Sequence, residues 1–258
     1  MGTMSPARLT ARIVDREALS VTTIDRLYQL YDAYYENVTR AIFAKDLSEK
    51  NWVILLEDIA EGQVRGFSTL MLNRESHGGK PVASVFSGDT IIDPDYWGDQ
   101  SLVRAWCSFM GRLLTRYPED DLYWFLLTKG YRTYLYLPLY FHEFFPRHDA
   151  PTPEYEQRLL DHLARAKFQD AYDPTTGLIT FEKSLGNLTG ELAEISPHRR
   201  QDPHVKYFLE RNPRFAEGVE LACLARIVIP NIRGLALRMV RVGMAEEQAQ
   251  AAGEMTTH

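Results

Sequence analysis

The chain has 258 residues, of which 45% are hydrophobic, and it carries a formal net charge of -6 at pH 7. A chain of this length can bury one sizeable core. The negative charge argues against wrapping nucleic acid, or lying on an anionic membrane surface, as the main function.

The first part of the chain predicts one helix and three strands after a polar N-terminal arm. Apolar and aromatic residues recur at helical spacing from Ile24 to Val38, which predicts a helix with an aromatic face. Three apolar, β-like runs follow, and turn residues between the first two predict a β-hairpin. The runs are residues 52–56, 66–72 and 82–92.

The middle of the chain predicts an amphipathic helix over residues 101–115. Its apolar face contains Trp106 and Phe109, and Asp99 or Ser101 can cap its start. The short apolar run 122–127 then predicts a buried central strand. An aromatic segment follows over residues 131–145, in which Pro138 would kink or break a helix.

The last part of the chain predicts two further helices and two further strands. The helices are expected to begin at Thr152-Pro153 and at Asp202-Pro203, and the strands to cover 177–183 and 219–229. From Glu246 onward the residues are small and polar, so a disordered end is expected. The predicted division is an arm, a core, an extension that completes the sheet, and a disordered tail: residues 1–19, 20–150, 151–242 and 243–258.

The expected location and metal content rest on sequence patterns that are absent from the chain. No apolar run approaches the roughly 20 residues of a transmembrane helix, and the N-terminus lacks the apolar segment of a signal peptide. Cys107 and Cys223 stand among apolar neighbours without metal-ligand spacing, as expected for buried thiols in a reducing compartment. The histidines show no metal spacing either. A cytoplasmic protein without a metal is therefore expected.

Two short motifs resemble those of the GNAT superfamily of N-acyltransferases. In that family, the fourth strand leads into a motif like V-x-P-x-Y-R-G-x-G-x-G, and Ile92, Pro94, Tyr96 and Gly98 match it. A second pattern, L-Y-x-x-x-G-F, is matched at the positions Leu135, Tyr136 and Phe141. The resemblance covers roughly the first 145 residues. It departs from the family at Trp97, Gln100 and Leu102, where arginine and two small residues are usual.

The resemblance implies an α/β (α+β) fold, namely a GNAT-like central mixed sheet flanked by helices, with a C-terminal helix/strand extension. It also implies that the donor is an acyl thioester, either acyl-CoA or the phosphopantetheine of an acyl-carrier protein. Backbone N–H groups around a glycine-rich turn would hold the donor's phosphates. The strand that ends at Ile92 would steady the thioester carbonyl through its backbone N–H. The donor-binding residues implied are Ile91, Ile92, Trp97, Gly98, Asp99, Gln100 and Ser101. With one glycine in the turn, CoA held differently, a carrier-bound donor, and no donor at all remain alternatives.

Acyl transfer to an amine needs a base for the amine and an acid for the leaving thiolate. Tyr136 stands at the family's acid position, although it is equally one of many aromatic residues that pack in this segment. Asp89 is the first choice for the base because it stands in an otherwise uncharged strand. Its alternative role is an ion pair with an arginine such as Arg132.

Three further residues are candidates for binding the substrate. Ser87 is expected to share the face of Asp89 by the period-two rule. His142 and Glu143 are the ionisable pair inside the aromatic segment.

The predicted function is therefore transfer of an acyl group to an amine of a small molecule. The alternative is a non-catalytic GNAT-like protein that binds a ligand or a partner. Expected partners are the small-molecule amine and, depending on the donor, an acyl-carrier protein; a homodimer is left open. In the GNAT-like arrangement, the strands near 82–92 and 122–127 would diverge, and the thioester would enter between them.

Overall fold

The computed structural model describes residues 8–34, 39–181 and 198–255. These residues divide into two compact units. Unit 1 takes in Met1–Leu72, Phe86–Pro118 and Gly234–His258, and unit 2 takes in Asn73–Val85 and Glu119–Arg233. The chain therefore contributes to each unit in separate stretches.

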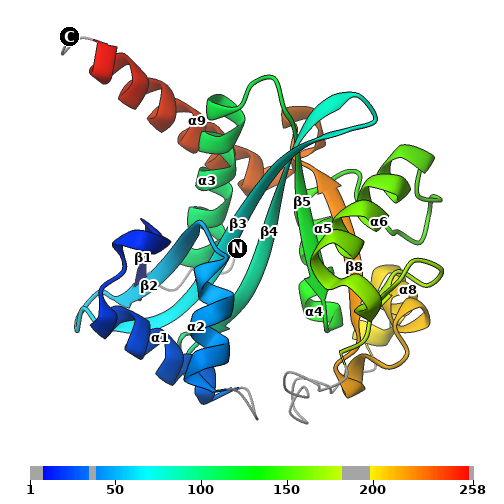
Figure 1. The fold of residues 1–258 in the computed structure, drawn as a ribbon, viewed down its shortest axis with the longest axis horizontal. Coiled ribbons are helices and arrows are strands. Elements are labelled where there is room, and N and C mark those ends of the chain that lie inside the picture. Colours follow the sequence, from blue (N-terminus) through cyan, green and yellow to red (C-terminus); the bar gives the residue numbers. More distant parts are fainter. Residues whose placement is uncertain (1–7, 35–38, 182–197, 256–258) are drawn as a thin grey trace. The chain divides into compact units, whose positions relative to one another are not determined.

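Unit 1 contains most of the first half of the chain and its C-terminal helix (Figure 1). Its strands follow one another in the order β1-β2-β3-β4, and β1 and β3 both pair antiparallel to β2. The ends of β3 and β4 that meet at their turn belong to unit 2. The elements are β1 (Leu9–Asp15), α1 (Val21–Asp32), α2 (Arg40–Ser48), β2 (Trp52–Asp58), β3 (Val64–His77), β4 (Lys80–Ile92), α3 (Ser101–Arg116) and α9 (Gly234–Met255).

Helices cover both faces of the sheet in unit 1. Val53 and Leu55 of β2 join a buried core with Leu27 of α1 and Phe43 of α2. Trp52 points to the other face, where its ring meets Phe109 of α3 at 4.8 Å. Because side chains alternate along a strand, the continuous apolar run of β2 serves both layers.

Helices α3 and α9 cross at very short range (Figure 1). A Cβ added to Gly111 would lie 1.9 Å from the carbonyl oxygen of Val240, and one added to Gly243 would lie 1.7 Å from that of Ser108. Arg112 and Arg116 pair with Glu246 and Glu247 beyond the crossing. Glycine is therefore required on both helices where their backbones approach.

Unit 2 is built around the pair of strands β5 and β8, which run antiparallel. Its strand order is β5-β8-β7-β6. Asp202 accepts hydrogen bonds from the backbone N–H groups of His204 and Val205, which caps α8. The elements are β5 (Asp121–Thr128), α4 (Tyr131–Tyr134), α5 (Tyr136–Tyr140), α6 (Glu154–Phe168), β6 (Tyr172–Asp173), β7 (Leu178–Ile179), α8 (Pro203–Arg211) and β8 (Glu220–Arg226).

The predicted fold class, a sheet flanked by helices with a C-terminal helix/strand extension, is confirmed. The strands near 52–56, 66–72, 82–92 and 122–127 and the helix over 101–115 are all present. The aromatic segment forms two short helices that meet at Leu135, three residues before Pro138.

Several expectations about single elements were wrong. The first helix ends at Asp32, and a second helix, α2, follows it; Tyr35 to Val38 lie outside the described residues. The arm contains a strand, β1, and residues 243–255 belong to α9 instead of a disordered tail. Strand β7 has only two residues. The four-part division of the chain stays a prediction.

Candidate functional site

The site predicted from the sequence begins on β4, whose regular alternation breaks beside Asp89. The indole N–H of Trp106 donates to Ser87 Oγ at 3.2 Å, so Ser87 faces α3. Thr90 bonds Ser68, which lies opposite Ile54 of β2 and therefore also faces α3. Positions 87 and 90 cannot share a face in a regular strand, so one extra residue is accommodated between them, as in a β-bulge.

Gly88 lies on the opposite face from Ser87. A Cβ on Gly88 would lie 2.4 Å from Thr69 Oγ1, which places Gly88 on the face covered by α1 and α2. Ile91 joins the core on that face. The extra residue lies at 88–89 or at 89–90, and these two positions put Asp89 on opposite faces of the strand. That Ser87 shares the face of Asp89 stays a prediction.

A buried lysine that the sequence analysis did not single out lies next to Gly88. The side chain of Lys50 is 1% exposed, and its ammonium pairs with Asp46 at 2.7 Å. Its Nζ is 3.7 Å from the position of a Cβ on Gly88. A charge this deeply buried needs such a partner. The Asp46–Lys50 spacing of four residues was the signal available in the sequence.

The turn after β4 is held by its own side chains. Gly98 has a φ of 91°, which only glycine adopts readily. The indole N–H of Trp97 donates to the carbonyl of Ile92 at 2.9 Å. Gln100 bonds the carbonyl of Gly98 and is the N-cap residue of α3, although its side chain does not cap the helix.

Asp99 connects this turn to β1. Its Oδ2 accepts from the backbone N–H groups of Arg8 and Leu9, at 2.9 and 3.2 Å, and its Oδ1 accepts from that of Ser101 at 2.7 Å. Burial opposes ionisation of this carboxyl, but the hydrogen bonds outweigh it and lower its pKa below the ordinary 3.8. Asp99 is therefore an ionised structural residue at the start of α3.

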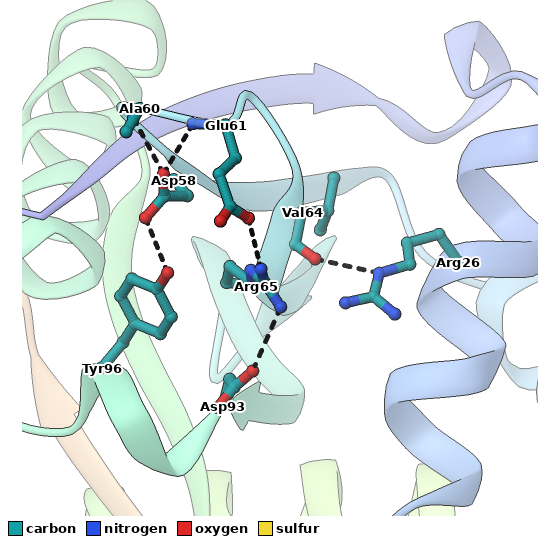
Figure 2. Close-up of polar contacts among 8 residues, drawn as sticks. All are labelled: Arg26, Asp58, Ala60, Glu61, Val64, Arg65, Asp93 and Tyr96. Atoms are coloured by element: carbon teal, nitrogen blue, oxygen red, sulfur yellow. Dashed lines mark hydrogen bonds and ion pairs between the residues drawn. The ribbon is translucent and has the colours of Figure 1, made fainter.

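A second set of contacts holds the turn against the loop between β2 and β3 (Figure 2). The hydroxyl of Tyr96 donates to Asp58 Oδ2 at 2.6 Å, and Asp58 Oδ1 accepts from the backbone of Ala60 and Glu61. Arg65 hydrogen-bonds Glu61 and lies 3.8 Å from Asp93. The family-like Tyr96 thus fixes the turn in place and does not face a ligand.

The turn fits a phosphate group only in part. Among the described residues, four backbone N–H groups here have no hydrogen-bond partner, namely those of Gly98, Gln100, Leu102 and Val103. They are suited to phosphate oxygens, as at other helix N-termini. Three carboxylates, those of Asp93, Asp95 and Asp99, stand in the same turn, and it contains no lysine or arginine. Arg65 lies beside Asp93, and Asp99 is hydrogen-bonded to three backbone N–H groups. The exposed carboxylate of Asp95 is therefore the charge that opposes a diphosphate.

The remaining predicted residues belong to unit 2. Tyr136 opens α5, is 41% exposed, and stacks on Tyr140 with ring centroids 5.7 Å apart. Partial burial raises the pKa of its hydroxyl above the ordinary 10.0. His142 is exposed and its Nδ1 accepts from Arg233, while the backbone of exposed Glu143 bonds Asn231.

The two predicted catalytic residues thus belong to different units, Asp89 to unit 1 and Tyr136 to unit 2. That they face one cavity stays a prediction, as does the divergence of β4 and β5. The alternative role of Asp89, an ion pair with Arg132, would also involve residues of both units and stays a prediction. Within residues 8–34, 39–181 and 198–255, no three His, Cys, Asp or Glu side chains form a metal-binding group, and no helix is long and apolar enough to cross a membrane.

No protein-family model and no curated protein sequence matches the chain. Solved structures that resemble it include a probable N-acyltransferase of Enterococcus faecalis, with 16% identity over 52% of this chain and 33% of that one, at a TM-score of 0.39. A GNAT family N-acetyltransferase of Escherichia coli in complex with CoA shows 19% identity over 50% and 67%, at 0.34. An acetyltransferase of Trypanosoma brucei shows 18% over 56% and 97%, at 0.35.

Each of these similarities covers about half of the chain. The chain spans about a third of the length of the Enterococcus faecalis protein. The identities and TM-scores are low, so the function proposed below rests on the residues of this chain.

Proposed function

We propose that this protein is an N-acyltransferase of the GNAT type, which transfers an acyl group from a thioester to an amine of a small molecule. The observation that carries the proposal is the passage from β4 to α3. There a broken strand that bears Asp89 leads through Gly98 to four backbone N–H groups without partners. This arrangement can hold the phosphate end of a pantetheine arm beside the end of β4.

In the proposed reaction, the amine nitrogen attacks the thioester carbonyl carbon and the C–S bond breaks. Asp89 takes the proton that the amine loses, and Tyr136 donates a proton to the departing thiolate. A thiolate has a reference pKa near 8.5, so a phenol whose pKa is raised above 10 gives up its proton reluctantly but still stabilises the thiolate by a hydrogen bond. Proton exchange with water then restores both residues.

The exposed carboxylate of Asp95 favours a donor with little negative charge at this place. CoA brings a diphosphate and a further phosphate, whereas the phosphopantetheine of a carrier protein brings a single phosphodiester. Four N–H groups are sufficient for one phosphate, and the charge of Asp95 opposes the second. A carrier-bound acyl group is therefore the favoured donor, and acyl-CoA is the alternative.

Thermal unfolding in the presence of different thioesters tests the proposal. We expect acetyl-phosphopantetheine or a long-chain acyl-phosphopantetheine to raise the melting temperature more than the matching acyl-CoA, because a ligand that binds only the native state stabilises it. Asp95→Asn removes one exposed carboxylate and should improve acyl-CoA binding. Asp15→Asn, at the exposed end of β1, is the matched control.

Turnover of the bound thioester separates an enzyme from a binding protein. Asp89→Asn should lower acyl transfer by about 10²-fold or more at unchanged melting temperature, as expected for loss of a general base. Tyr136→Phe should slow thiol release with donor binding nearly unchanged. If thioesters bind but the wild type transfers no acyl group to any of a panel of amines, the non-catalytic alternative replaces the enzyme. If no thioester binds at all, the donor site is wrong.

A further inference from the structure

A separate pocket lies in unit 1 between α1 and the start of β3. It is a hollow of about 450 Å³ that is largely open to solvent. None of its residues belongs to the segment 87–101. They are Thr22, Asp25, Arg26, Gln29, Gln63 and Val64. The first four stand at helical positions i, i+3, i+4 and i+7, so one face of α1 forms one wall.

Arg26 is held in place with most of its donors unused. Its Nε donates to the carbonyl of Val64 at 3.0 Å, which fixes the guanidinium beside the pocket (Figure 2). In the described part of the chain, neither Nη1 nor Nη2 has a hydrogen-bond partner. A guanidinium fixed at one nitrogen and open at the other two is suited to a carboxylate, which it binds through two parallel hydrogen bonds.

Asp25 supplies the opposite charge in the same pocket. Its Oδ1 accepts both contacts from Arg40, which extends from α2. Its Oδ2 has no hydrogen-bond partner among the residues described, so this oxygen can accept from a ligand. The side chains of Thr22, Gln29 and Gln63 likewise make no hydrogen bonds with the described residues, and each can both donate and accept.

We propose that this pocket binds a small zwitterion of the α-amino-acid class. The ligand carboxylate would pair with Arg26 Nη1 and Nη2, and its ammonium would pair with Asp25 Oδ2. A phosphate would leave Asp25 Oδ2 without a donor, and a simple amine would leave Arg26 Nη1 and Nη2 unpaired. This binding activity is independent of acyl transfer and does not rest on it.

The test is a titration of the full ¹⁵N-labelled chain, followed by amide NMR signals. The probe is a pool of the standard L-amino acids, and the comparison pools are the same compounds N-acetylated or converted to primary amides. We expect shifts of the signals of residues 22–29 and 63–64 with the free amino acids. Each modified pool should bind at least about tenfold more weakly, because each lacks one charged partner.

Two variants and one control locate the binding. Arg26→Gln should abolish the shifts, and Gln63→Glu, on an exposed turn, should weaken them by repelling the carboxylate. Arg12→Gln is the control, because Arg12 is an exposed arginine of β1 outside the pocket that pairs with Glu57. If Arg26→Gln lowers the melting temperature, its loss of binding can come from loss of folding. Binding by Gln63→Glu then decides whether the pocket holds the amino acid.

Three results would overturn the proposal: no shifts with the free pool, equal binding of the N-acetylated pool, or unchanged binding in both folded variants.

Discussion

Asp58 shows how much one carboxylate does to hold the candidate turn. It is 8% exposed and accepts hydrogen bonds from the hydroxyl of Tyr96 and from two backbone N–H groups. The hydrogen bond from Tyr96 is the main reason why its pKa lies below the ordinary 3.8. The hydrogen bonds favour the ionised form, which ties the stability of unit 1 to pH.

We expect Asp58→Asn to lower stability at neutral pH and to reduce its dependence on acid. A carboxyl with a lowered folded-state pKa contributes stability above the unfolded value, and the contribution is lost as pH falls through the folded value. The difference between wild type and variant should therefore shrink below pH 3.8. Urea unfolding at several pH values measures it. A difference that stays constant down to pH 2 would show that Asp58 acts by packing alone.

Lys50 and Gly88 show what the structure adds at the candidate site. The sequence pointed to Asp89 because it is a charge in an uncharged strand, and the structure adds a buried Lys50–Asp46 pair beside the same stretch of β4. Nothing in the sequence shows that the strand breaks there, because a bulge depends on which residues of β3 lie opposite.

At the scale of elements, the α3–α9 crossing depends on two glycines. A methyl group at either position would overlap a backbone carbonyl of the other helix, which cannot move aside as a side chain can. Gly111→Ala and Gly243→Ala should each cost about 1–3 kcal/mol in free energy of unfolding, the usual cost of overpacking.

Gly253→Ala is the control for this prediction, since nothing lies within 4 Å of a Cβ there. It should be neutral or stabilising by up to about 1 kcal/mol, because alanine favours the helix over glycine. The double variant at 111 and 243 should cost less than the sum of the single changes, because both sites lie in the same helix crossing and one backbone shift relieves both. Unfolding in urea measures all four variants. Wild-type stability of Gly111→Ala would mean that the helices do not cross as closely as described.

At the scale of the whole molecule, unit 1 contains stretches from both the first and the last part of the chain. Helix α9 returns from unit 2 and packs on α3, whose start carries the candidate turn. The ion pairs from α3 reach Glu246 and Glu247.

Removal of residues 234–258 should therefore destabilise unit 1, although it removes only the end of the chain. We expect the melting temperature to fall by several degrees and thioester binding to weaken. Removal of residues 248–258 keeps the glycine crossing and both ion pairs, so it should leave both properties nearly unchanged. Calorimetry and the thermal shift assay compare the two truncations. Equal behaviour of both would show that the crossing does not support the turn.

The sequence alone determined the features that depend on local patterns. The strand runs at 52–56, 82–92 and 122–127, the amphipathic helix from Ser101 and the glycine turn at Gly98 all follow from side-chain periodicity and backbone freedom, and the structure has them. The same patterns led to the GNAT resemblance and to the α/β class.

Only the tertiary structure decided the features that depend on distant neighbours. The small, polar residues from Glu246 onward indicated disorder, yet α9 continues to Met255, and Gly243 within it meets the backbone of α3. Tyr96 matched a ligand-binding motif, but Asp58, 38 residues earlier, accepts the hydrogen bond from its hydroxyl. A local pattern records the preferences of a residue, whereas the partner that satisfies those preferences is set by how the whole chain folds.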